Sequence, residues 1–353
     1  MGSAPASGPI DTSAYRESMM RRAMANAETA RLRSRPNPWV GAVLVDKYGV
    51  VYDGATHKPG GQHAEREALA AAGNAAHGAT VFTTLEPCGH TGRTGPCTQA
   101  LIDAGVARVV IGVTDPDDNV SGRGIEQLEA AGIDVMSGVL EAEVAQQLAP
   151  YLTQRRTGRP HVIVKLAMTL DGFIAAPDGT SQWITGPEAR RDVHRLRAES
   201  DAIIVGTGTV TADDPSLTVR DYTPAAEDAE LPHLDPWRIV VGSTAAQIHD
   251  GARTAPFESW DGPLEDLLDE LGSRGKFQVM VEGGAAVAGS FHRAGLVDEY
   301  WLYMAPALMG GGDGRNAFAG DGAPTMADVQ RGEFVSATPL ANDLRVIYRP
   351  GRG

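Results

Sequence analysis

Three side chains of the types that bind zinc occur in this sequence in the order histidine, cysteine, cysteine. His63 stands in GGQHAEREALAAAG (60–73), Cys88 follows Leu-Glu-Pro at the end of an apolar run, and Cys97 follows Pro96. One imidazole and two thiolates form a tetrahedral set whose fourth position is left for water, the pattern of a catalytic rather than a structural zinc ion. The sequence therefore predicts a zinc-activated water.

A carboxylate stands two positions beyond the histidine. His63 and Glu65 are about 200° apart around an α-helix, so they cannot share a helical face. We expect both in the first turn, where the two side chains can turn toward one point. Zinc lowers the pKa of a bound water to about 7, and Glu65 could take a proton from that water and deliver it to a leaving amine. H-A-E followed by P-C and a later cysteine is typical of the zinc deaminases of nucleobases.

The spacing of the two cysteines departs from the compact form of that signature. Eight residues separate Cys88 from Cys97, where the compact form has two, so the thiols cannot share one tight turn. The chain has no other cysteine and no secretory signal at its start, which favours the cytoplasm, where disulfides are rare. Metal binding then explains the pair better than a disulfide does.

The elements that must position these residues alternate along the first 150 residues. We expect helices over 15–33, 63–73, 96–105 and the first part of 122–139, a hairpin over 42–56, and strands over 79–88, 107–116 and the end of 122–139. Such alternation is typical of a mixed sheet with helices on both faces.

A second alternation follows residues 153–164, whose Pro, Gly and Arg content is typical of a connector. We expect strands over 162–175, 201–209, 237–243, 277–284 and 299–308, and helices over 189–200, 259–275 and 285–295. The strand of 201–209 runs into a glycine turn, and Asp171 and Gly172 could equally form a turn between two strands. The acidic, Pro-rich residues 221–236 predict an exposed loop.

Two glycine turns in the second half have the form of phosphate sites. Gly206 and Gly208 come directly after an apolar strand, and Gly283 and Gly284 stand between a strand and a helix. Backbone N–H groups at a helix start can hold phosphate, so two such turns suggest a dinucleotide. Neither fits the Rossmann consensus, and plain strand-to-helix turns explain each pair as well.

Four segments closely resemble the deaminase half of the bifunctional riboflavin-biosynthesis deaminase–reductase family. They are PNPWVG (36–41), GATHKPGGQHAE (54–65), TLEPCGHTGRTGPC (84–97) and the DP…GRGI of 115–125. The resemblance implies a cytidine-deaminase-like three-layer α/β/α domain over residues 1–155. Within it, the small, polar, Pro-containing composition of residues 1–14 predicts a loose tail. It assigns His63, Cys88 and Cys97 as zinc ligands, Glu65 as the catalytic proton shuttle, and Asn37 and His90 to the substrate pocket.

Four later segments are similar to the reductase half of the same family. They are VKLAMTLDGFIA (164–175), SQWITG (181–186), VGTGTVTADDPSLTVR (205–220) and VEGGAAVAGS (281–290). The resemblance implies an NADPH-dependent, dihydrofolate-reductase-like α/β domain over residues 159–353. The cofactor-binding residues that it implies are Met168, Trp183, Thr209, Asp213, Ser243, Gly284, Ala285, Ala286, Val287, Ala288, Gly289 and Ser290. The substrate-binding residues are Ser181, Arg197, Leu217, Arg220 and Glu282, to which we add Lys165 as an active-site cation whose role the sequence does not fix.

The activity implied is a two-step conversion in riboflavin biosynthesis. The first half would hydrolyse an amino group from 2,5-diamino-6-ribosylamino-4(3H)-pyrimidinone 5′-phosphate with the help of Zn²⁺. The second would reduce the ribosyl group of 5-amino-6-(5-phosphoribosylamino)uracil to ribityl with NADPH. Two arginines suit such a pyrimidine ribose-phosphate substrate, because guanidinium groups bind phosphate in a bidentate manner. The resemblance also implies a homo-oligomer formed through the reductase half.

Composition limits the other partners. The formal net charge of the 353-residue chain is −14, with no Lys/Arg run to offset it, which argues against nucleic acid. No stretch approaches 18 consecutive apolar residues, so we expect no membrane span. Two other functions stay open: a deaminase of another nucleobase or of tRNA with a fused accessory domain, and a non-catalytic zinc scaffold with His90 as a fourth ligand.

Overall fold

The computed structural model describes residues 12–89, 95–117, 120–224, 231, 234–245, 248 and 251–351. The chain divides into two compact units, one up to Thr157 and the other from Gly158 onward. Within the described ranges, no helix is both long enough and apolar enough to cross a membrane.

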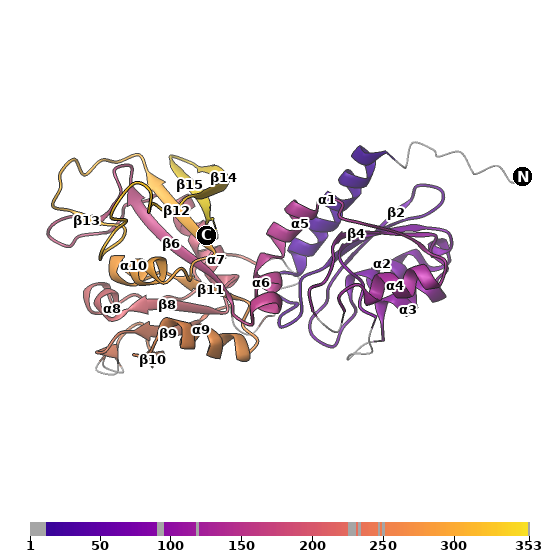
Figure 1. The fold of residues 1–353 in the computed structure, drawn as a ribbon, viewed down its shortest axis with the longest axis horizontal. Coiled ribbons are helices and arrows are strands. Elements are labelled where there is room, and N and C mark those ends of the chain that lie inside the picture. Colours follow the sequence, from indigo (N-terminus) through magenta and orange to yellow (C-terminus); the bar gives the residue numbers. More distant parts are fainter. Residues whose placement is uncertain are drawn as a thin grey trace, which may run out of the picture. The chain divides into compact units, whose positions relative to one another are not determined.

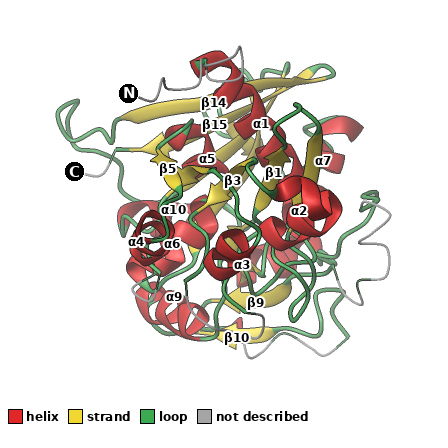
Figure 2. Ribbon diagram, turned by 90° about the vertical axis from the view of Figure 1, so that its right-hand side faces the viewer, coloured by secondary structure: helices red, strands yellow, loops and turns green. Residues whose placement is uncertain are grey.

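A five-stranded mixed sheet forms the centre of the first unit, in the order β2-β1-β3-β4-β5. Figure 2 labels three of its strands, β1, β3 and β5. The strands are β1 (Gly41–Val45), β2 (Val51–Ala55), β3 (Thr80–Leu85), β4 (Arg108–Val113) and β5 (Asp134–Ser137). β1 runs antiparallel to β2 and β3, whereas β3, β4 and β5 are parallel to one another. The carboxyl ends of β3 and β4 therefore meet at one edge, where the loop carrying Cys88 begins.

Helices cover both faces of this sheet (Figure 1). They are α1 (Ser13–Ala30), α2 (Ala64–Ala72), α3 (Cys97–Asp103), α4 (Arg123–Ala130), α5 (Glu141–Gln147) and α6 (Ala149–Thr157), with a short 3-10 helix, η2, over Gly73–Ala76. A Cβ on Gly41 would overlap the α1 backbone, and a Cβ on Gly54 would overlap the α2 backbone. Because Gly54 pairs with the residue after Gly41, the two glycines face opposite sides, and the three-layer α/β/α arrangement is confirmed.

Two local expectations in this unit have clear outcomes. His63 has an extended backbone and α2 starts just after it, while Gly73 ends the helix in the left-handed region, at φ +53°. The connector expected from residue 153 was wrong in part, because α6 continues to Thr157. Arg155 in that helix lies over the Tyr151 ring and pairs with Asp117, which gives the stretch a packing role.

The second unit contains an eight-stranded sheet in the order β10-β9-β8-β11-β6-β12-β15-β14. Its strands are β6 (His161–Thr169), β8 (Ala202–Gly206), β9 (Trp237–Val241), β10 (Glu258–Trp260), β11 (Gln278–Val281), β12 (Glu299–Ala305), β14 (Gly332–Leu340) and β15 (Asp343–Pro350). The run from β10 to β12 is parallel, and β15 and β14 add an antiparallel hairpin. A two-stranded sheet pairs β7 (Phe173–Ala175) with β13 (Arg315–Asn316).

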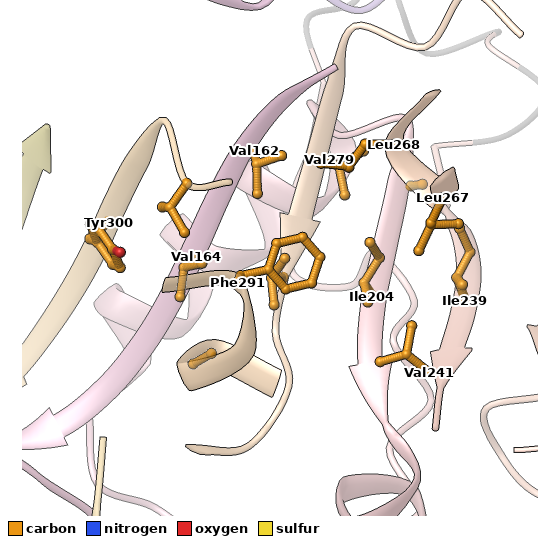
Figure 3. Packing of buried hydrophobic residues seen from close by; sticks show 14 of the residues in the cluster. Val162, Val164, Ile204, Ile239, Val241, Leu267, Leu268, Val279, Phe291 and Tyr300 are labelled. Carbon is orange, nitrogen blue, oxygen red and sulfur yellow. The ribbon is translucent and has the colours of Figure 1, made fainter. Parts of the chain in front are cut away.

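Two apolar cores hold this sheet between helices. The helices are α7 (Pro187–Ala198), α8 (Thr207–Asp213), α9 (Leu264–Ser273) and α10 (Ala285–Arg293). On one face, Phe291 of α10 and Leu267 of α9 pack on Val162 and Ile204 of the sheet (Figure 3). On the other, Leu196 of α7 packs against Ile203 and its neighbours. This is the mixed α/β arrangement expected for the second half.

Two local expectations in this unit have clear outcomes. The alternative of a turn at Asp171 and Gly172 is confirmed, because the chain turns there from β6 into β7, with Gly172 at φ +89°. Residues 207–209, expected as a glycine turn after the strand, begin helix α8. The β14–β15 hairpin was not anticipated at all.

Candidate active sites

His63, Cys88 and Cys97 come from three different elements and meet at one point. Their ligand atoms all lie within 4.8 Å of one another. His63 directly precedes α2, Cys88 stands in the loop after β3, and Cys97 is the first residue of α3. The His63 Nδ1 atom is 3.6 Å from the Cys88 Sγ and 3.3 Å from the Cys97 Sγ. The Cys97 backbone N–H also faces the Cys88 sulfur, at 3.5 Å.

The donor set and its spacing fit a zinc ion. Zinc–ligand bonds of about 2.3 Å to sulfur and 2.0–2.1 Å to nitrogen, at tetrahedral angles, place neighbouring ligand atoms about 3.6 Å apart. The two measured separations from His63 are close to that value. A hydrogen bond from Cys97 is the main cause that lowers the pKa of Cys88 to about 4, whereas the same bond and burial raise the pKa of Cys97.

Glu65 lies beside this cluster. Its side chain is almost fully buried, and its Oε2 atom is 3.5 Å from the Cys97 Sγ. Burial raises the pKa of Glu65 above its ordinary value, and the positive charge of His63 only partly opposes this. The expectation that His63 and Glu65 reach one point from the start of the helix agrees with this geometry. The proton-shuttle role itself stays a prediction.

A second buried carboxylate, Glu86, was not predicted from the sequence, and it organises the loops around Cys88. Glu86 accepts backbone N–H bonds from Asp115 and Gly122 on one oxygen, and from Gly124 and Ile125 on the other. It thereby ties the end of β3 to the loop after β4 and to the start of α4. Glutamate in a Leu-Glu-Pro-Cys run carries no pattern that reveals such partners.

Two further side chains fix the segments that hold the cysteines. The Gln127 amide on α4 donates to the Gly89 carbonyl, and its oxygen accepts from the Thr98 hydroxyl in the first turn of α3. The Arg66 guanidinium donates to the carbonyls of Gly95 and Pro96, just before Cys97. The positions of the cysteines thus depend on contacts from α2 and α4.

The two predicted substrate residues of the first unit are less informative. Asn37 is half-buried in the turn before β1, where its backbone N–H donates to the Ser34 carbonyl over 2.8 Å. His90 lies outside the described residues. Neither its substrate contact nor the alternative of a fourth zinc ligand is tested.

The second unit contains a pocket of about 690 Å³ between the carboxyl end of the sheet and α7. Ten of the predicted residues line it: Lys165, Ser181, Trp183, Arg197, Thr209, Asp213, Leu217, Arg220, Glu282 and Gly284. Predicted substrate and cofactor residues therefore share one cavity, as hydride transfer between two bound molecules requires.

A buried ionic cluster forms one wall of this pocket. The Glu282 carboxylate accepts from Lys165 Nζ at 3.2 Å and from Arg197 Nε and a terminal guanidinium nitrogen at 2.8 and 2.9 Å. Burial alone would raise the pKa of Glu282, but the charges of Arg197 and Lys165 outweigh it and hold this pKa at about 2. Glu282 is therefore a fixed anion that orients two cations.

Arg220 and several residues that sequence reasoning missed also line the pocket. Arg220 contacts the hydroxyls of Ser216 and Thr218 with its guanidinium and donates its backbone N–H to His194 Nδ1 at 3.0 Å. Arg190, His194 and Arg253 also line the pocket. The spacing of Arg190, His194 and Arg197 along α7 is that of one helical face, and this pattern could have revealed the first two.

Eight predicted cofactor residues do not line this pocket, namely Met168, Ser243, Ala285, Ala286, Val287, Ala288, Gly289 and Ser290. Met168 packs against the apolar core, and Ala288 belongs to it. Gly289 lies so close to the Ala319 carbonyl that a Cβ would overlap it. Ala286 and Ser290 are exposed, and the cofactor contacts of these eight residues stay predictions.

The turn before α10 leaves backbone N–H groups at the helix start without a side-chain cap. Gly284 has an extended backbone and donates its N–H to the Thr209 hydroxyl at 2.9 Å. A Cβ on Gly283 would crowd the Val287 side chain at 3.0 Å. No side chain caps the start of α10, so its first backbone N–H groups can bind an anion.

Comparisons with known proteins agree with this division into two sites. Residues 13–113 match the family described as the cytidine and deoxycytidylate deaminase zinc-binding region, and residues 160–346 match the RibD C-terminal domain. The chain is 44% identical to the riboflavin biosynthesis protein RibD of Mycobacterium tuberculosis, over 88% of this chain and 90% of that protein. It is 40% identical to RibD of Escherichia coli, over 93% and 97%.

Two solved structures are similar over nearly the full length. Acinetobacter baumannii RibD has a TM-score of 0.87 and 34% identity, covering 97% of this chain and all of that one. A diaminohydroxyphosphoribosylaminopyrimidine deaminase/5-amino-6-(5-phosphoribosylamino)uracil reductase from Thermotoga maritima has a TM-score of 0.84 and 31% identity, covering 96% and 99%.

Proposed function

The chain belongs to the family of bifunctional riboflavin-biosynthesis deaminase–reductases, and from this premise we propose how its own residues perform the two reactions. The substrate of the first reaction is a diaminopyrimidinone ribosylamine 5′-phosphate, which loses its 2-amino group as ammonia. The product is 5-amino-6-(5-phosphoribosylamino)uracil, whose ribosyl group the second reaction reduces to ribityl. We assign the deaminase to residues 1–155 and the reductase to residues 159–353.

For deamination, the chain supplies three metal ligands and one proton carrier. His63, Cys88 and Cys97 would hold the zinc ion, which when bound acts as a Lewis acid that makes water a better nucleophile at neutral pH. Glu65 then takes a proton from the attacking water at one carboxylate oxygen and passes it to the departing nitrogen. Water adds to the ring carbon and ammonia leaves, so no further reactant is needed.

The single observation that carries this assignment is the convergence of these side chains. Three ligand atoms from separate elements gather within 4.8 Å, and the buried Glu65 carboxylate stands 3.5 Å from one of them. A structural zinc site normally has four protein ligands, and only three gather here among the described residues.

For reduction, the chain positions substrate and cofactor in the pocket of the second unit. NADPH, when bound, supplies the hydride. Lys165 and Arg197, both held by Glu282, form a positively charged wall where the sugar can be oriented. Arg220 provides a guanidinium for the 5′-phosphate, since its side chain contacts only hydroxyl groups of the described protein.

The experiment that tests both assignments supplies the diaminopyrimidine substrate with and without NADPH. Ammonia release without NADPH, followed by NADPH consumption once the cofactor is added, is the expected result. Release of ammonia from cytidine or tRNA but not from this substrate would replace the proposal by a different deaminase.

We further propose that the enzyme is a cytoplasmic homo-oligomer joined through its reductase unit. In support, β14 is the edge strand of the eight-stranded sheet, and Phe334 on it is 78% exposed. Exposed edge strands with apolar side chains favour pairing with another chain. Phe334→Glu should lower the mass measured by light scattering, whereas Tyr48→Glu, at an equally exposed aromatic of the first unit, should not.

A further inference from the structure

His194 occupies a position in the reductase pocket that the two-step chemistry above does not use. It lies on α7 one turn before Arg197, lines the pocket, and is 7% exposed. Its Nδ1 atom accepts the backbone N–H of Arg220 at 3.0 Å. The Nδ1 atom thus binds the backbone of the segment that carries Arg220, which we propose to bind the phosphate.

This hydrogen bond fixes the tautomer of the imidazole. Because Nδ1 accepts, the proton of the neutral ring is on Nε2. The Nε2 atom makes no hydrogen bond to any residue in the described part of the chain. Protonation of Nδ1 would set its proton against the Arg220 N–H, so the arrangement requires a neutral ring.

The surrounding charges keep the ring neutral. Arg197 faces it from α7 and Arg220 from the 214–221 segment, while Glu282 at the end of β11 and Asp221 act in the opposite sense. Arg190 and Lys165 line the same cavity. Burial and then the two arginines lower the pKa of His194, and the carboxylates only partly compensate.

The Nε2–H group of His194 lies among cations and makes no hydrogen bond within the described part of the chain, so it is suited to bind an anion. Arg197 directs its Nε and both terminal nitrogens to Glu282 and the Thr218 carbonyl, so its capacity is largely used within the protein. A phosphate has three strong acceptor oxygens. Arg220 alone cannot serve all of them, and a neutral N–H beside it adds a donor without adding a third buried cation.

We propose that His194 is a substrate-binding residue of the reductase, donating its Nε2–H to the 5′-phosphate of the ribose-phosphate substrate beside Arg220. The inference rests on the proposed reductase function. It also gives the α7 histidine two distinct tasks, which substitution can separate. Nδ1 holds the Arg220 backbone, and Nε2 reaches the substrate.

Two variants separate these tasks. His194→Asn places an oxygen near the Nδ1 position, so it keeps the acceptor for Arg220 and loses the Nε2 donor. A hydrogen bond to a charged group is worth enough that KM for the uracil substrate should rise about tenfold or more. The kcat and the KM for NADPH should stay within about twofold. His194→Gln places an amide N–H near Nε2 and should show a smaller rise.

The pH profile provides a readout that a purely structural role would not give. In the wild type, KM for the substrate should rise as the pH falls through the lowered pKa of His194. The Asn variant should lose this component and keep only the titration of the phosphate itself, whose second pKa is about 6.

Several results would overturn the proposal. They are a wild-type KM in His194→Asn, a larger effect in His194→Gln than in His194→Asn, or a parallel rise in the KM for NADPH. The kcat and the KM for NADPH of the same preparations serve as the internal control for a folded reductase unit. Failure of the proposed function is distinguishable, because the wild-type chain would then not consume NADPH with this substrate at all.

Discussion

Replacing Glu86 by glutamine should damage the deaminase site without touching any residue that contacts the metal or the substrate. The carboxylate accepts four backbone N–H groups, from Asp115, Gly122, Gly124 and Ile125, at 2.9–3.3 Å. Its side chain is 3% exposed. Glutamine has nearly the same shape, so the change alters hydrogen bonding and charge while leaving the packing volume almost constant.

The magnitude follows from counting acceptors. Each carboxylate oxygen accepts two N–H groups, and the amide that replaces one oxygen can only donate, so two backbone donors lose their acceptor. A buried donor left unsatisfied costs about 1–3 kcal/mol, which gives a loss of about 2–6 kcal/mol from the unfolding free energy. Natural domains have only about 5–15 kcal/mol in total, so the first unit should be clearly weakened. Cys88 follows Glu86 by two residues in the same loop, and we expect a roughly tenfold to hundredfold loss of deaminase activity.

The assay compares Glu86→Gln with Glu129→Gln, an identical change at an exposed position of α4. Denaturant unfolding, zinc content by metal analysis, ammonia release and NADPH consumption would be measured on both full-length proteins. The first three should fall in Glu86→Gln alone, and the reductase rate on supplied uracil substrate should stay. Unfolding, zinc content and ammonia release equal to those of the control would refute the view that Glu86 organises the site.

Three other outcomes are expected. Glu65→Gln should retain zinc by metal analysis but release no ammonia, because the ligands remain and the proton carrier is lost; full activity would exclude this role for Glu65. Chelation of zinc should abolish ammonia release and leave NADPH consumption with supplied uracil substrate intact, and loss of both would show that the metal supports more than the first unit. The folded pKa of Glu282, about 2, lies below its ordinary value of 4.5, so its charge stabilises the fold by about 3 kcal/mol above pH 4.5, and about 2 kcal/mol of this is lost by pH 3. Denaturant unfolding at pH 6 and pH 3 should show this loss in the wild type and not in Glu282→Gln, and equal pH dependence in both would contradict the ionic cluster.

The parts of the protein that could be predicted from the sequence are those that depend on residue type and order alone. His63, Cys88 and Cys97 could be selected because few roles suit that set, and the apolar runs of buried strands such as β8 and β11 follow from composition alone. The β14–β15 hairpin was not predicted, because β14 lies at the edge of the sheet, is largely exposed and has no apolar run. The end of helix α6 was not predicted, because Arg155 and Arg156 give the segment a composition typical of a linker. Only the packing of Arg155 shows that it is part of a helix.

Other features depend on distant partners and could not be predicted. Glu86 acquires its role from backbone N–H groups many positions away, and no local pattern encodes such contacts. The lining of the reductase pocket could be predicted where a motif supplied it, as for Arg197 and Arg220. On α10 the motif also assigned cofactor binding to Ala288 and Gly289, which lie beyond the first turn. The helix buries both of these residues.

The contrast between Glu65 and Glu282 shows how burial and neighbouring charge together set the role of a glutamate. Both side chains are withdrawn from water, and burial raises the pKa of each. At Glu65 burial prevails and raises the pKa of the carboxyl above its ordinary value. At Glu282 two cations within 3.2 Å reverse it, so this carboxylate stays ionised and cannot serve as a proton carrier at physiological pH. Proton delivery in the reductase pocket must therefore come from another group or from water, while Glu282 acts by holding Lys165 and Arg197 in place.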